Sequence, residues 1–232
     1  MRCLDSQNTI YERLLELPLF QGHSKEDLTS ILTKIKVDFG NYRRGQTIVN
    51  QDDPCHEIVF LMSGEVNVSR TSLHKDLLFV EDFKAVQSFG AETLFGLRQN
   101  FSYTLTAKDE VRTFVVDKSG IVNSLFNYDV FRYNLLNMLT TRIQRCNQVL
   151  WLSEEENIER SFVLLCRRNF IHPAGPKVIE GGMVALARMM NRPRIHVSNM
   201  LNSLAEAQMV VLGRKKIIIP QFEKLIAHAS SL

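Results

Sequence analysis

Hydrophobic and polar positions change their spacing along the chain, and the changes separate an N-terminal helical segment from a β-rich region and a helical C-terminal part. Between residues 9 and 38, leucines and isoleucines recur at helical spacing, and Ser24 with the acids after it predicts a helix N-cap. From residue 37 to 117, short β-type runs alternate with turn residues. Many short strands at regular spacing predict an antiparallel roll or barrel rather than a parallel sheet. The expected strands include Thr47–Val49, Ile58–Met62, Val66–Val68, Leu77–Val80 and Thr113–Val116.

Residues 127–151 carry the longest helical pattern of the chain. Apolar side chains recur there on two neighbouring stripes, which Arg142 interrupts at one position. A 3–4 spacing on a helix of this length favours a coiled-coil-like seam with a second chain, and packing against the chain's own roll is the alternative. The candidate dimerisation residues are Leu135, Leu136, Leu139, Ile143, Cys146 and Leu150.

The stretch Met183–Glu206 reads as two short helices separated at residues 190–193. Asn191 lies where a tight turn between helices needs a positive φ, which Asn tolerates better than most residues. The second helix has one apolar face and an opposite face that is polar but not acidic. This pattern is typical of a helix-turn-helix, whose second helix enters the DNA major groove. An ordinary pair of surface helices is the alternative.

Residues 209–220 follow as two apolar β segments around Gly-Arg-Lys-Lys, which predicts a hairpin wing with a basic tip. The tip suits a phosphate or the minor groove, whereas its alternative is a solvated turn. Upstream, Val178-Ile179 predicts a short strand, and Ser153–Glu156 predicts a polar hinge.

The charge of the chain is uneven, although its formal net value is only +3. Residues 157–232 hold 11 Lys and Arg against 4 Asp and Glu, a net of +7, and residues 1–156 hold 17 against 21, a net of −4. Positive charge gathered on the half with the two-helix motif is the pattern of a phosphate-binding module.

Composition also excludes several classes of protein. No run of about 20 apolar residues predicts a membrane span, and the N-terminus lacks the layout of an export signal, so a cytoplasmic protein is expected. The four cysteines form no CxxC pair, which argues against structural zinc or an iron–sulfur cluster. Neither a nucleophile–base pair nor a phosphate loop is recognisable, so we expect no enzyme, cofactor or metal.

The ordered set of these motifs resembles the Crp–Fnr superfamily of transcription regulators over nearly the whole chain. The resemblance is carried by Leu17–Phe20, Ser24–Leu28, Arg44–Val49 and Ile58–Val66, and by the order of long helix, hinge, two-helix motif and wing. It implies an α+β protein with an N-terminal antiparallel β-roll of the cyclic-nucleotide-binding, jelly-roll type. A long dimerisation helix and a C-terminal winged helix-turn-helix would follow. The implied domains are a β-roll effector domain over 1–126, the central helix and hinge over 127–153, and a DNA-binding domain over 154–232.

The effector site departs from the superfamily pattern. Members that bind cyclic AMP use a Phe-Gly-Glu turn for the ribose and an Arg-Ser or Arg-Thr pair for the phosphate. In residues 89–96 the acid comes one place late, at Glu92, and Phe101 stands on the arginine's position. Losing a charge-assisted phosphate contact is costly, so we expect no cyclic AMP binding. The candidate effector pocket comprises Gly90, Glu92, Thr93, Arg98 and Ser102.

The residues expected to contact bases, at the start of the second helix of the two-helix motif, also differ from the superfamily's Arg-Glu-Thr-Val-x-Arg. We call them the reading residues. Arg194 is kept and is expected on a guanine edge, Ile195 suits a thymine methyl group, and Asn199 suits adenine. The operator should therefore differ from the superfamily's consensus. The full set of expected DNA contacts is Arg192, Arg194, Ile195, His196, Ser198, Asn199, Asn202, Arg214, Lys215 and Lys216.

The sequence thus predicts a homodimeric, sequence-specific DNA-binding transcription regulator without enzymatic activity. Its expected partners are an operator in double-stranded DNA, a second copy of the chain and, if it activates, RNA polymerase. An unidentified small effector other than cyclic AMP is left open, and no membrane partner is expected. The alternative is a signalling module that binds a cyclic nucleotide or another small ligand and uses its C-terminal domain for protein contacts.

Overall fold

The computed structural model describes residues 11–151 and 157–230, with the side chains of 148–151 left out, and it divides into two compact units. Unit 1 comprises residues 1–67 and 83–143, and unit 2 comprises 68–82 and 144–232. Unit 2 therefore includes a segment that the sequence placed inside the roll. The domain boundaries given above stay predictions, and the expected hinge Ser153–Glu156 lies outside the described residues.

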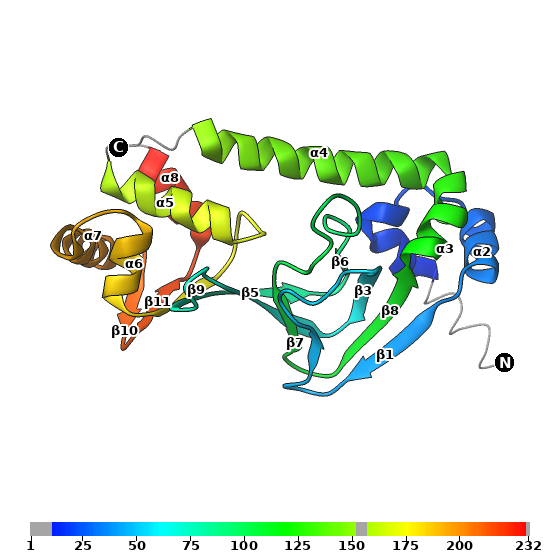
Figure 1. Ribbon diagram of the computed structural model, residues 1–232, viewed down its shortest axis with the longest axis horizontal. Coiled ribbons are helices and arrows are strands. Elements are labelled where there is room, and N and C mark those ends of the chain that lie inside the picture. Colours follow the sequence, from blue (N-terminus) through cyan, green and yellow to red (C-terminus); the bar gives the residue numbers. More distant parts are fainter. Residues whose placement is uncertain (1–10, 152–156, 231–232) are drawn as a thin grey trace. The chain divides into compact units, whose positions relative to one another are not determined.

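Unit 1 combines short helices with a set of antiparallel strands (Figure 1). Each strand expected from the sequence is found, although β1, β6 and β7 were not foreseen. After a helical stretch over residues 11–16, the elements are η1 (Pro18–Phe20), α2 (Lys25–Lys34), β1 (Asp38–Tyr42), β2 (Thr47–Val49), β3 (Glu57–Ser63), β4 (Glu65–Thr71), β6 (Gln87–Phe89), β7 (Thr104–Ala107), β8 (Val111–Asp117), α3 (Lys118–Asn123), η2 (Leu125–Asn127) and α4 (Asp129–Trp151). Of these, β4 and α4 continue into unit 2.

One sheet of unit 1 has the strand order β1-β8-β3-β6, with antiparallel pairing throughout, and β2 pairs with β7. The apolar core of this unit joins the sheet to the short helices. Phe60 on β3 stacks on Phe114 on β8, with ring centroids 4.4 Å apart, and Phe20 packs against both rings. The expected N-cap at Ser24 is confirmed, because its hydroxyl accepts the N–H of Asp27 in a capping box that starts α2.

Unit 2 is built from helices and a small antiparallel sheet. Its elements are most of β5 (Leu77–Lys84), α5 (Ile158–Asn169), β9 (Lys177–Gly181), α6 (Met183–Met189), α7 (Arg194–Glu206), β10 (Val211–Gly213), β11 (Lys216–Ile219) and α8 (Phe222–Ser230). The strand order is β10-β11-β9-β5, so β9 lies between the C-terminal hairpin and a strand from residues 77–81. The short strand expected at Val178-Ile179 is confirmed within β9.

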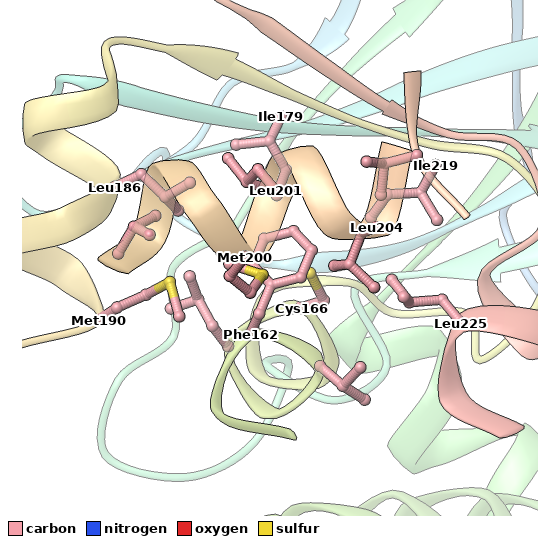
Figure 2. Packing of buried hydrophobic residues seen from close by; sticks show 14 of the residues in the cluster. Phe162, Cys166, Ile179, Leu186, Met190, Met200, Leu201, Leu204, Ile219 and Leu225 are labelled. Atoms are coloured by element: carbon pink, nitrogen blue, oxygen red, sulfur yellow. The ribbon is translucent and has the colours of Figure 1, made fainter. Parts of the chain in front are cut away.

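The core of unit 2 lies between α7, α5, α8 and this sheet. Figure 2 shows Met200 and Leu204 of α7 on the side of Phe162 and Cys166 of α5, and it shows Leu201 beside Ile179 of β9. Leu225 of α8 completes the same cluster. Within the described residues, no helix is both long enough and apolar enough to cross a membrane.

Candidate nucleic-acid interface and effector region

The turn between α6 and α7 has the geometry that the sequence predicts. Asn191 takes φ +51°, which confirms the expected positive φ, and Pro193 then precedes the first residue of α7. The N–H of Arg192 donates to the carbonyl of Ala187 over 3.1 Å, which closes the turn. The side chain of Ala187 is 5% exposed, so a small residue occupies the place where the helices meet.

The two faces of α7 differ sharply. Val197, Met200, Leu201 and Leu204 are at most 4% exposed and fix the helix to the core. The opposite side leaves most of the predicted reading residues in solvent. No acidic residue occurs between Arg192 and Asn202, although Glu206 at the end of α7 is exposed. Exposed there are Arg192, Arg194, Ile195, His196, Asn199 and Asn202, with Ser198 half-buried.

Ile195 stands out on that surface because it is apolar and 62% exposed at the start of a helix. Four residues on, Asn199 lies on the same stripe, and Asn202 follows three residues later. An isolated exposed apolar side chain is ordinary, but here it lies between hydrogen-bonding side chains. The stripe therefore offers one apolar and two amide groups to a partner.

The hairpin β10–β11 presents two positive charges at its turn. Gly213 pairs with Lys216, so Arg214 and Lys215 form the turn, and Lys215 adopts φ +54°. Both side chains are exposed. Lys216, also predicted as a tip residue, instead pairs with Glu180 of β9, with Nζ 3.2 Å from Oε1. The charge available at the tip is thus that of Arg214 and Lys215.

Strand β5 and the turn before it support the α6–α7 scaffold within unit 2. Asp76 pairs with Arg188, in the last turn of α6. The pKa of the Asp76 carboxyl is lowered, first by the hydrogen bond from Ser72 and further by the Arg188 charge. Further along the strand, Glu81 forms a buried ion pair with Lys177 of β9. Neither interaction follows from the sequence pattern.

In unit 1 the candidate effector region is closely packed around Gly90. This glycine has φ +94°, and a Cβ there would lie 3.0 Å from Cε1 of Phe101 and 2.8 Å from the carbonyl of Glu57. Phe101 is 3% exposed, so the residue in the arginine's position is part of the core. Thr93 donates its hydroxyl to the carbonyl of Gly90 over 3.3 Å.

One carboxylate of this region is joined to α4 by an ion pair, and a buried tyrosine lies close to it. Glu92 lies with Oε1 3.0 Å from Nη1 of Arg142, and the carboxylate side chain is 13% exposed. Tyr103 is fully buried, and its hydroxyl accepts the N–H of Gly90 over 2.9 Å. Burial, and secondly the nearby Glu92 carboxylate, raise the pKa of the Tyr103 hydroxyl well above its ordinary value, so it stays protonated.

The structure brings only part of the predicted pocket together. Gly90, Glu92 and Thr93 share one turn, Ser102 is half-buried, and Arg98 lies exposed in the loop. Sequence reasoning missed Tyr103 and assigned Arg142 only to a helix stripe. The one available signal was that Arg142 interrupts an apolar pattern, which indicates a polar partner on the facing surface.

The predicted dimerisation residues divide into two groups on α4. Leu135 is 6% exposed and belongs to the core of unit 1, and Leu139 packs against that core. Leu136 and Ile143 are 56% and 57% exposed, and Cys146 is exposed as well. The side chain of Leu150 lies outside the described residues.

Comparison with known proteins finds a family that resembles the β-rich part of the chain. Residues 39–128 match the family model of the cyclic nucleotide-binding domain. The chain is similar to this family over those residues, and its resemblance to Crp–Fnr transcription regulators is confirmed.

Individual relatives agree with this class. The global nitrogen regulator of Synechococcus elongatus is 23% identical over 193 residues, which cover 80% of this chain and 87% of that protein. The crystal structure of the Thermus thermophilus catabolite activator protein is 23% identical with a TM-score of 0.53, covering 93% of this chain and 99% of that one. The sensor domain of the transcriptional regulator DNR from Pseudomonas aeruginosa is 21% identical with a TM-score of 0.53, covering 66% and 97%. At these identities the solved structures establish the fold.

Proposed function

We propose that this protein is a homodimeric, sequence-specific DNA-binding transcription regulator of the Crp–Fnr type, with a winged helix-turn-helix in unit 2. The observation that carries the proposal is the exposed face of α7, which is polar, cationic at its start and opposite a fully buried face. A recognition helix needs this division, because one side must be held rigidly while the other reaches base edges. The exposed Arg214–Lys215 turn adds cations for phosphate.

The chemistry of that face assigns a role to each side chain. Arg194, at the first position of α7, is suited to a bidentate contact with guanine. Ile195 is suited to a thymine methyl group and Asn199 to adenine. Arg214 and Lys215 would add contacts to the phosphate backbone that are independent of sequence. The operator then combines a guanine with A·T pairs in each half-site.

Dimerisation is supported by the exposed side of α4. Tyr133, Leu136, Thr140 and Ile143 recur at three- and four-residue steps and are exposed. This spacing is that of a two-stranded coiled-coil seam. A two-fold dimer would present two copies of α7 to two half-sites of a palindromic operator, and an activating form would also contact RNA polymerase.

The effector of the β-roll, in this proposal, is a small molecule other than cyclic AMP. The place of the phosphate-binding arginine holds buried Phe101, and Arg142 is already paired with Glu92. A cyclic phosphate would meet an aromatic ring where relatives of the superfamily offer a cation. The competing function, a signalling module with a protein-binding C-terminal unit, is favoured by the match to the cyclic nucleotide-binding domain.

The deciding experiment is selection of bound DNA from a random pool, followed by binding measurements on the selected operator. Arg194→Ala is expected to weaken specific binding by roughly 1–3 kcal/mol and to relax the preference at one base pair. Arg168→Ala is the matched control, because it removes the same charge from an exposed position on α5.

Three outcomes separate the two functions. Enrichment of a palindromic motif, with loss of discrimination in the Arg194 variant alone, supports the regulator. Equal losses in both variants would contradict the assignment of α7 as the reading helix. Failure of any sequence to be enriched would favour the signalling module.

A further inference from the structure

A cavity of unit 1 lies between the β1-β8-β3 sheet and the N-terminal helices, and its lining residues differ from those of the effector region. It encloses about 640 Å³ between this sheet, the helical stretch over residues 11–16 and α2. In Figure 1, β1 and β8, which both contribute lining residues, run side by side. None of its lining residues belongs to the Gly90–Tyr103 region. We call this cavity the outer groove. Its volume falls within the range of small-molecule sites, roughly 300–1,000 Å³.

One end of the outer groove is polar and is built from three adjacent strands. Asn41 on β1 and Ser63 on β3 are both direct register partners of Arg112 on β8. Directly opposed residues of antiparallel strands project from the same face of the sheet. A shift of register between Leu61 and Ser63 brings Met62 and Ser63 together opposite Arg112, as β-bulges do when they redirect a side chain. A guanidinium, an amide and a hydroxyl group therefore lie in one row.

The rest of the outer groove is apolar. Phe114 forms part of its floor and is held rigidly by its stacking on Phe60. Leu14 and Leu32 line it from the two helices, and Phe39 lines it from β1. Phe39 is 69% exposed, which leaves a large aromatic face for a ligand to cover.

The ionisable side chains that line the outer groove are both cationic. Its only ionisable lining residues within the described part of the chain are Arg13 and Arg112. Arg13 lies 3.9 Å from Glu16, in a pair whose side chains are 44% and 59% exposed and thus well screened. No carboxylate among the described residues lines the groove, so it favours an anion.

We propose that the outer groove binds an amphipathic monocarboxylate, such as a medium-chain acyl carboxylate. The carboxylate lies on Arg112, with Asn41 and Ser63 as additional hydrogen-bond donors, and the acyl chain covers Phe39 and Phe114. Guanidinium–carboxylate pairs are strong and directional. Burial of an alkyl chain against the apolar wall of the groove removes apolar surface from water, which favours binding. This site is independent of the proposed DNA-binding function and of the effector region.

The test uses dodecanoate, kept well below its micelle concentration, with the full-length protein in isothermal titration calorimetry and native mass spectrometry. One dodecanoate per chain is expected to bind saturably. Dodecan-1-ol, which has the same chain without the charge, is expected to bind about tenfold more weakly. Arg112→Met should lower the affinity for dodecanoate about tenfold and leave the affinity for the alcohol nearly unchanged.

Two further variants keep the test decisive if one fails to fold. Arg44→Met is the matched control, because Arg44 is an exposed arginine in the turn after β1 and does not line the groove. Phe39→Asp alters a largely exposed position, and its carboxylate should abolish dodecanoate binding by repulsion and loss of apolar contact. Absence of saturable binding to the wild type would overturn the proposal. Equal affinities of wild type and Arg112→Met, or of acid and alcohol, would also overturn it.

Discussion

Lys177 and Glu81 form an ion pair withdrawn from water, with Nζ 2.7 Å from Oε2 and side chains 2% and 3% exposed. The same carboxylate accepts the backbone N–H groups of Ile171 and His172, over 2.5 and 3.0 Å. A single acid on β5 therefore fixes both β9 and the turn after α5. The Lys177 ammonium also lies 5.6 Å from the ring centroid of Phe170.

Breaking this pair from one side should destabilise the protein strongly. Lys177→Met leaves the Glu81 carboxylate buried with only its two backbone donors, and such a change typically costs about 3–5 kcal/mol. Urea unfolding followed by circular dichroism, at one fixed protein concentration, measures the loss.

The control for that prediction is an exposed ion pair between β11 and β9. Lys216→Ala breaks the pair with Glu180, whose side chains are 43% and 46% exposed. It should cost no more than about 1 kcal/mol, because exposed pairs are screened by solvent. Similar losses in the two variants would contradict the view that burial makes the Lys177–Glu81 pair important.

The N-cap of α3 should make stability depend on pH. The Asp117 carboxylate accepts the N–H of Gly120 over 2.7 Å and the hydroxyl of Ser119 over 2.8 Å, and these bonds lower its pKa from the ordinary 3.8. Because the folded-state pKa is lowered, the contribution is complete above the unfolded pKa and is lost as pH falls through the folded one. Asp117→Ala should therefore cost about 0.5–2 kcal/mol near neutral pH.

The measurement compares urea midpoints of wild type and variant from neutral pH to well below 3.8. The difference between them should shrink at the acid end. Asn157, whose amide oxygen caps α5 by accepting from Glu159 and Arg160, provides the control, because an amide does not titrate. The cost of Asn157→Ala should stay constant, and a cost of Asp117→Ala that is equally constant would refute the role of the charge.

Several local features could be predicted from the sequence because they depend on near neighbours. Ser24 is followed three residues later by an acid, which is enough to define a capping box. Asn191 occupies a helix-to-helix turn where few residues tolerate a positive φ. The strands of the roll were recognisable because apolar runs are bounded by turn residues.

Features that depend on distant pairing could not be predicted. The alignment of β5 with β9 joins residues that are about a hundred positions apart, and local periodicity carries no information on such a register. Lysine is a residue type that is usually exposed, and only the partner Glu81 explains why Lys177 is buried. In the same way, Arg142 looked like a defect in an apolar stripe until Glu92 was found beside it.

Cyclic AMP should give no heat of binding in calorimetry with the wild-type protein. Phe101 is buried where a phosphate would need a cation. The ring also packs closely on Gly90, because a Cβ added to that glycine would lie only 3.0 Å from it. The nearby Arg142 is occupied by Glu92. Saturable binding at micromolar concentration would contradict this prediction. A weak signal is most expected in Glu92→Gln, because this variant removes the charge that pairs with Arg142.

The hairpin tip should contribute to DNA affinity without contributing to sequence preference. Lys215→Ala should weaken binding to selected and unrelated sequences alike, and should reduce the slope of log K against log salt by about one. Lys216→Ala should change the slope less, because that ammonium is already paired with Glu180. Fluorescence anisotropy over a series of salt concentrations provides both slopes. A preference for the operator that changes with Lys215→Ala would mean that the tip reads bases rather than phosphates.

The exposed stripe of α4 gives the last prediction. Ile143 is 57% exposed although it is a large apolar residue, and Leu136 lies one heptad before it at 56%. If this stripe is the seam between two chains, Ile143→Asp buries two carboxylates against each other in the dimer and should produce monomers. Val122→Asp is the control, because Val122 is an apolar residue of α3 exposed to 42% and lies outside the stripe. Sedimentation equilibrium distinguishes the outcomes: a dimer that survives Ile143→Asp would show that the stripe is not the interface. A monomer with an unchanged circular dichroism spectrum, which binds a single half-site but not the palindrome, would connect this seam directly to the reading of DNA.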